Sequence, residues 1–173
     1  MVMKNINFLV RLFLIVAALT FYSCTTEPID PAINLNDFGG NNNLASIFKV
    51  NFSGATWSAT ATNAIVSSNT IFINAMNSDG STISILVQGI ATGTYPTNTN
   101  IISYTPLGSS FGYWSVNNSS LTENTGSISI TTIDTVNKKI SGTFNYKGYW
   151  SDTATTSILP VQFTSGVFTN ISY

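Results

Sequence analysis

The chain has 173 residues, of which 43% are hydrophobic and only 8% are charged, and it contains no histidine. A net charge of −1, with few and scattered basic residues, excludes the clustered basic surface that nucleic-acid binding requires. The lack of histidine removes the commonest general base, the Ser-His-Asp arrangement and most zinc sites, so the sequence disfavours an enzyme and predicts neither a metal site nor another cofactor.

The N-terminus predicts an exported, lipid-anchored protein. Lys4 and Arg11 form a basic start, and an unbroken apolar run follows over residues 12–22. This run is shorter than the roughly 20 apolar residues that a membrane-spanning helix needs, and its layout is typical of a secretory signal peptide. Cys24, the only cysteine, follows Ser23 at the end of the run and resembles the lipidated cysteine of a bacterial lipobox.

This interpretation divides the chain into three regions. We expect a lipoprotein signal peptide at residues 1–23, the lipidated cysteine with a flexible tether at residues 24–45, and an all-β domain at residues 46–173. Diacylglycerol and a fatty acid such as palmitate on Cys24 would hold the protein on a membrane, because two or more acyl chains bind stably. Ordinary cleavage beside an unmodified cysteine and an uncleaved anchor are the alternatives.

From Ser46 onward, apolar and polar residues alternate with a period of two, which predicts strands. Short strands are expected over residues 48–52, 57–62, 70–76, 82–87, 92–96, 101–105, 111–116, 126–133, 140–150, 157–164 and 166–173. Asp79-Gly80 predicts a hairpin turn, because such a turn needs positive φ. Ile133 is out of phase with Ile128 and Ile130, which predicts a bulge.

About ten short strands without a helical apolar stripe predict an all-β, antiparallel fold. The pattern fits either a β-sandwich or a barrel-like fold of the lipocalin kind, and it does not distinguish them. With its one cysteine acylated the chain can form no disulfide, so the stability of the domain must come from its core.

Two motifs frame the domain, one near its start and one at its end. They are Phe52-Ser53-Gly54 with Trp57-Ser58-Ala59, and Gly166, Phe168, Ile171 and Tyr173. The chain resembles, over about residues 48–173, a family of small Bacteroidetes lipoproteins that carry a domain of unknown function. The resemblance implies a β-fold and a lipid-anchored place in the cell envelope, at the outer membrane, with the membrane face left open. Its motifs are turn glycines and core aromatics, so it implies no activity.

Two adjacent aromatic pairs are the candidate ligand-binding residues. Tyr113-Trp114 and Tyr149-Trp150 lie in expected strands, where neighbouring side chains point to opposite faces of a sheet. Each pair should therefore turn one ring inward and one outward. Exposed rings can stack on sugars or close the mouth of a barrel over an apolar ligand. The alternative is that these rings fill the core and stabilise neighbouring strands.

The sequence thus predicts a non-catalytic module of the cell envelope, with a binding or structural role. Its expected partners are the membrane, through the lipid anchor, and a glycan or another envelope protein. A carrier of a small molecule or lipid, with a hollow barrel interior, is the alternative function.

Two short segments resemble the O-glycosylation sequon of the same bacterial group. They are Asp134-Thr135-Val136 and Asp152-Thr153-Ala154, which makes Thr135 and Thr153 candidate acceptors. Both lie in expected loops, where an acceptor is accessible. Added hexoses would be visible in the intact mass of the protein from its native host.

Replacing the lipidated residue tests the anchor. We expect Cys24→Ser to move the protein from the membrane pellet to the soluble fraction, because the acyl chains are its only expected membrane attachment. Fractionation and fatty-acid labelling in the native host provide the measurement. A Cys24→Ser protein that still pellets with membranes and still takes up label contradicts the prediction.

Overall fold

The computed structural model describes residues 45–155 and 157–173. Cys24, the expected signal peptide and almost all of the expected tether lie outside these residues. In the described part the chain forms eleven strands, and no helix there is long and apolar enough to cross a membrane. The strands are β1 (Ile47–Phe52), β2 (Ala55–Ser58), β3 (Ala61–Ser67), β4 (Thr70–Met76), β5 (Thr82–Gln88), β6 (Gly93–Pro96), β7 (Ile101–Thr105), β8 (Tyr113–Trp114), β9 (Gly126–Asp134), β10 (Lys139–Trp150) and β11 (Val161–Ser172).

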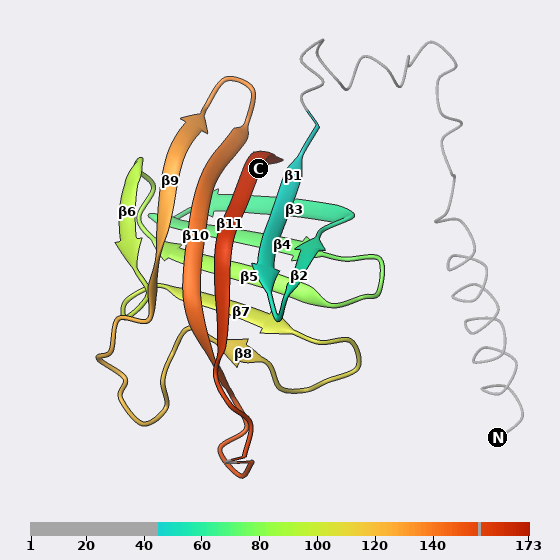
Figure 1. Ribbon diagram of the computed structural model, residues 1–173. Coiled ribbons are helices and arrows are strands. Elements are labelled where there is room, and N and C mark those ends of the chain that lie inside the picture. The colour runs from blue at the N-terminus through green and yellow to red at the C-terminus, as the bar shows by residue number, and fades with distance from the viewer. Residues whose placement is uncertain (1–44, 156) are drawn as a thin grey trace, which may run out of the picture. The chain divides into compact units, whose positions relative to one another are not determined.

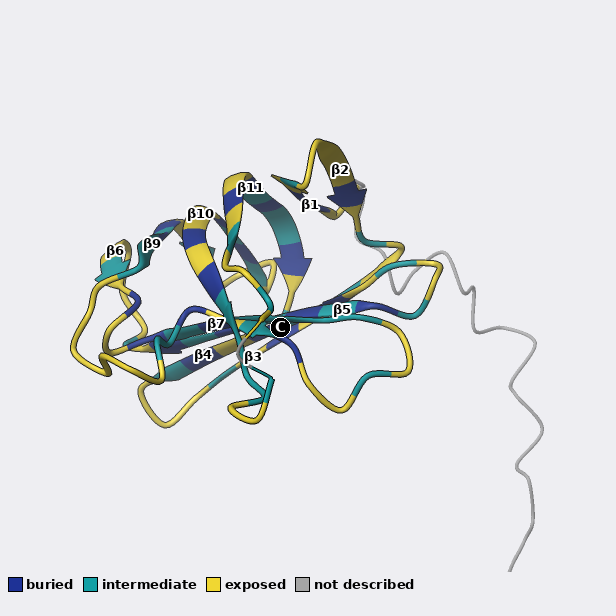
Figure 2. Ribbon diagram, turned by 60° about the horizontal axis from the view of Figure 1, so that its bottom comes forward, coloured by how far each residue is buried: buried dark blue, intermediate teal, exposed yellow. Residues whose placement is uncertain are grey.

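The strands form two antiparallel layers whose directions cross (Figure 1). The first layer has the order β6-β9-β10-β11-β1-β2, and the second has the order β3-β4-β5-β7-β8. Figure 2 shows the first layer arching over the second. The expected all-β, antiparallel fold is confirmed, and its form is a sheet that curls into a half-barrel.

β10 joins the two layers because it changes its partner along its length. One edge of β10 pairs with β11 from Lys139 to Gly148. The other edge pairs with β9 as far as Tyr146 and then with β8 at Tyr149 and Trp150. One strand thereby belongs to both layers, and the sheet continues around the corner.

Glycines beneath aromatic rings let β10 and β11 approach closely. Gly142 lies opposite Phe168, and Gly166 lies opposite Phe144. A Cβ atom on Gly142 would collide with the Ser129 carbonyl oxygen and the Phe168 ring, and one on Gly166 would collide with Phe144. These two glycines are therefore required by packing.

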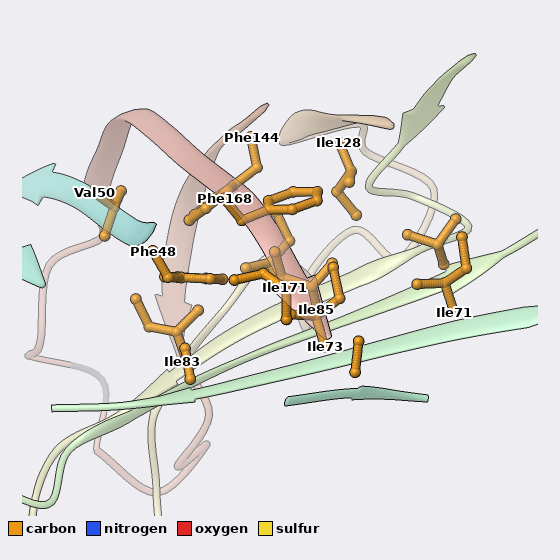
Figure 3. Close-up of a cluster of buried hydrophobic side chains, with 14 of the residues drawn as sticks. Phe48, Val50, Ile71, Ile73, Ile83, Ile85, Ile128, Phe144, Phe168 and Ile171 are labelled. Atoms are coloured by element: carbon orange, nitrogen blue, oxygen red, sulfur yellow. The ribbon is translucent and has the colours of Figure 1, made fainter. Parts of the chain in front are cut away.

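Alternating side chains from both layers fill the space between them. Figure 3 shows Phe48, Phe144 and Phe168 of the first layer turned toward Ile73 and Ile85 of the second. All five are at most 2% exposed, and the Phe48 and Phe144 ring centroids are 5.3 Å apart. Apolar burial of this extent is the main stabilising contribution to the fold.

The expected strand over residues 57–62 is wrong, because the chain changes layers within it. The Ala59 N–H donates to the Phe48 carbonyl oxygen in the first layer, at 2.9 Å. The next N–H, of Thr60, donates to the Met76 carbonyl oxygen in the second layer, at 2.8 Å. Small and polar residues alternate on both sides of this crossing, so the sequence pattern runs through it without interruption.

The two strands expected over residues 157–164 and 166–173 are one strand, β11. Its register shifts twice against β10, and Ser165 and Asn170 adopt positive φ angles of 53° and 54° at these shifts. Bulges therefore break the alternation without ending the strand. The bulge expected near Ile133 is confirmed, because the register leaves Thr131 as an extra residue. The strand expected over 111–116 is reduced to Tyr113–Trp114.

A buried hydrogen-bond chain ties the edge of the first layer to the β4–β5 turn of the second. The Trp57 Nε1–H donates to the Ser81 Oγ at 2.8 Å, and the Ser81 hydroxyl donates to Asp79 Oδ1 at 2.6 Å. Trp57 and Ser81 are 5% and 1% exposed. The bonds from Ser81 hold the pKa of the Asp79 carboxyl below its usual value.

Removing the central hydroxyl of this chain tests its contribution. We expect Ser81→Ala to lower the free energy of unfolding by about 1–3 kcal/mol, because the buried Trp57 N–H loses its acceptor. Urea unfolding measures the loss. In a double-mutant cycle with Trp57→Phe, the two losses should be less than additive, since Phe has no N–H to satisfy.

Ser78→Ala is the matched control, because Ser78 is an exposed serine of the same turn. Its effect should stay within about 0.5 kcal/mol. Equal losses for the Ser81 and Ser78 variants would contradict the buried-bond explanation.

Candidate functional site

A cleft of about 260 Å³ lies between the loop after β8 and the end of β10. The loop after β8 forms one wall, and the end of β10 with the β10–β11 loop forms the other. The walls include two aromatic rings, two amides, a carboxylate and a hydroxyl: Tyr149, Trp150, Asn117, Asn118, Asp152 and Thr153.

The strand register brings the four candidate aromatic residues together. Tyr149 lies opposite Trp114, and Trp150 lies opposite Tyr113. Tyr113 and Trp150 face inward, with ring centroids 5.1 Å apart. Trp114, in contrast, is 41% exposed on the outer face, on the side of the sheet that it shares with Tyr149. Both pairs thus divide between the two faces, and their binding role stays a prediction.

Glu123 holds two residues of the cleft in place. Its Oε2 accepts a hydrogen bond from the Asn117 Nδ2–H at 2.6 Å, and its Oε1 accepts one from the Tyr149 hydroxyl at 3.2 Å. The bond from Asn117 is the main reason that the pKa of Glu123 is lowered, with Tyr149 and the nearby Lys147 ammonium adding to the effect. Glu123 is therefore ionised at neutral pH and acts as an acceptor for both walls.

Hydrogen bonds hold the first part of the β10–β11 loop, residues 151–155. Asp152 accepts bonds from the Ala154 N–H at 2.9 Å and from the Thr155 hydroxyl at 2.6 Å. Ser151 exchanges two bonds with Gly112, since its N–H donates at 2.8 Å and its Oγ accepts at 3.0 Å. These bonds order residues 151–155 beside the cleft.

The two candidate glycosylation acceptors lie in exposed turns. Thr135 lies in the β9–β10 turn, and Thr153 lies on the rim of the cleft. In each turn the preceding aspartate accepts backbone N–H bonds, which accounts for the Asp-Thr pattern structurally. Their modification stays a hypothesis.

The chemistry of the cleft favours binding through rings and neutral polar groups. Within residues 45–155 and 157–173, no group of three or more His, Cys, Asp or Glu side chains is placed to hold a metal ion. The two carboxylates, Glu123 and Asp152, both serve as hydrogen-bond acceptors for protein groups.

Sequence reasoning missed Asn117, Asn118 and Glu123 as site residues. Asn117 and Asn118 line the cleft because the loop after β8 returns toward the end of β10, and Glu123 acts on it through its bonds to Asn117 and Tyr149. Their local sequence is that of an ordinary polar loop, and only the Asn-Asn-Ser run at 117–119 distinguishes it.

Comparison with known proteins gives a family for the chain. Residues 44–172 match a family described as a domain of unknown function, DUF6252. Neither the curated proteins nor the solved structures contain a significant match. The matched segment spans every strand and the whole cleft. This chain therefore belongs to the DUF6252 family.

Proposed function

We propose that this protein is a lipid-anchored cell-envelope protein whose β-domain is a non-catalytic binding module for a neutral glycan. The observation that carries the proposal is the cleft, whose lining combines the aromatic residues Tyr149 and Trp150 with amide and hydroxyl groups. A sugar has an apolar C–H face and a polar hydroxyl edge, so it needs these two kinds of surface side by side.

The polar groups of the cleft suit hydroxyl recognition. The Asn117 and Asn118 amides each offer donors and an acceptor, and the Thr153 hydroxyl offers both functions. The Asp152 carboxylate disfavours an anionic ligand. The volume of about 260 Å³ is slightly below the roughly 300–1,000 Å³ of pockets for drug-sized ligands, so a sugar unit fits better than a large cofactor.

The packed interior favours this surface module over a carrier. Between the layers, the Tyr146 and Phe163 rings stack with centroids 4.3 Å apart, and both residues are 0% exposed. Phe52 packs on Phe163 from the neighbouring strand, at 4.6 Å. A lipid or other apolar cargo would have to displace these rings.

The cleft lies at the end of the domain away from the N-terminal attachment. β1 begins at Ile47, which pairs with Thr169, whereas β11 starts at Val161 at the opposite end of the domain (Figure 1). The cleft adjoins that start, because Ile158 and Pro160 line it. At about 3.3 Å per residue, the two positions on β11 are roughly 26 Å apart. The N-terminal attachment of the domain therefore does not obstruct the cleft.

Glycan-array screening of the full-length protein tests the proposal. The protein should be kept in a detergent without a sugar headgroup, which would otherwise compete for the cleft. We expect at least one neutral glycan to bind and to quench tryptophan fluorescence. Thr153→Ala should weaken this binding about fivefold, the value of one hydrogen bond of about 1 kcal/mol. Trp150→Phe should also weaken it, because a smaller side chain changes the wall of the cleft.

Thr135→Ala is the matched control, because Thr135 is also an exposed threonine that follows an aspartate in a turn. It should bind as the wild type does. Equal affinities for the Thr153, Trp150 and Thr135 variants would contradict a ligand site in the cleft.

The ionisation of the Glu123 carboxylate sets the expected pH dependence of glycan binding. Its pKa is lowered in the folded protein, so the acceptor for Asn117 and Tyr149 is present at neutral pH and is lost only as pH falls through that lowered pKa. We expect constant affinity near neutrality and weakening in the acid range. Glu123→Gln should bind more weakly at neutral pH and should remove the acid-range change.

Asp134→Asn provides the control for this profile. Asp134 also has a lowered pKa, caused mainly by the Asn137 N–H, but it lies in the β9–β10 turn. This variant should keep the wild-type pH profile. Retention of the acid-range change by Glu123→Gln would show that Glu123 does not position the cleft.

A further inference from the structure

A row of outward-facing side chains crosses the second layer and ends at the cleft. Cross-strand pairing places each member directly opposite the next, from β3 through β4, β5, β7 and β8 to β10. This outer row consists of Asn63, Asn74, Ser84, Ser103, Trp114 and Tyr149.

Strand alternation keeps the outer row on the solvent side. The residues next to it along the strands, including Ile73, Ile85 and Ile102, are 0% exposed in the core. Within the row, the Ser84 hydroxyl donates to Asn74 Oδ1 at 2.9 Å. This bond links neighbouring members of the row across β4 and β5.

Apolar side chains border the outer row. Ile65, Phe72, Leu86 and Ile101 form the parallel row beside it. Phe72 and Met76 are 36% and 43% exposed, and Trp114 at the end of the outer row is 41% exposed. The face therefore presents hydrogen-bonding groups beside exposed apolar side chains. The cleft presents the same combination.

The part of this face that lies on β3, β4, β5 and β7 is also uncharged. The outward positions of these four strands, all within the described part of the chain, contain no acidic or basic residue. Charged groups lie at the cleft end of the row, where the Lys147 ammonium is 5.3 Å from the centroid of the Tyr149 ring and Glu123 accepts a hydrogen bond from the Tyr149 hydroxyl. An anionic lipid surface or a nucleic acid would be held by basic side chains, so the uncharged face fits a neutral ligand.

We propose that the outer row is an extended track for a linear neutral glycan whose end occupies the cleft. The proposal rests on the proposed function and adds that the ligand is a polymer. Tyr149 belongs both to the row and to the cleft wall, so the two surfaces are continuous. Five inter-strand steps of about 4.8 Å make the row about 24 Å long, which accommodates several sugar units.

The dependence of affinity on chain length tests the track. Calorimetry with the full-length protein in sugar-free detergent would use neutral gluco-, manno- and xylo-oligosaccharides, from the disaccharide to the hexasaccharide. In the series that binds, we expect the affinity of the wild type to rise at least tenfold with length. Asn74→Ala with Ser103→Ala should abolish that rise and leave disaccharide affinity unchanged, because neither residue lines the cleft.

Asn145→Ala is the matched control. Asn145 also lies opposite a serine on an outward strand position, with its Nδ2–H donating to Ser127 Oγ at 3.3 Å, but it belongs to the first layer. This variant should keep the full gain with length.

Four results would overturn the track. A wild-type affinity that is independent of length, or a length gain that survives in the Asn74/Ser103 variant, removes the track and leaves the cleft. No binding of any array glycan or oligosaccharide removes both the track and the proposed function. If the solution mass is twice that of the chain and Phe72→Asp returns it to the monomer value, the face binds a second copy of the chain instead.

Discussion

The close approach of strands around β10 is the constraint on which the rest of the structure depends. Phe168 covers Gly142, and a Cβ atom on Gly148 would lie 2.9 Å from both the Phe163 ring and the Tyr113 Cβ. Gly148 is also the last residue paired with β11 before β10 moves to β8. Because no side chain intervenes there, the core rings and β8 can meet at the corner, and one sheet supplies both layers.

The same corner creates the candidate site. Once β8 pairs with the end of β10, Trp114 must lie beside Tyr149 on the outer face, and Tyr113 must lie beside Trp150 on the inner face. The cleft and the outer row therefore arise from a single register. A change that disturbed this pairing would alter both surfaces together, whereas Asn74 and Thr153 can be changed separately.

The motif residues found in the sequence contribute to the fold, and none of them lines the cleft. Trp57 hydrogen-bonds to Ser81 across the layers, Phe168 covers Gly142, and Gly166 makes room for Phe144. Each contributes to closing the core. Asn117, which lines the cleft, and Glu123, which holds it, lie outside these motifs, in a loop whose geometry depends on side-chain hydrogen bonds. Ligand preference can consequently vary while the half-barrel is retained.

The sequence by itself determined the strands whose partners are close along the chain, such as β4 and β5, because alternation and a turn residue are local signals. It also determined that the adjacent aromatic residues divide between faces. Only the tertiary structure decided the layer crossing at Ala59–Thr60, the bulges that keep β11 continuous, and the meeting of Trp114 with Tyr149. The reason is that pairing between distant strands depends on how the whole core closes, and periodicity carries no information about the partner.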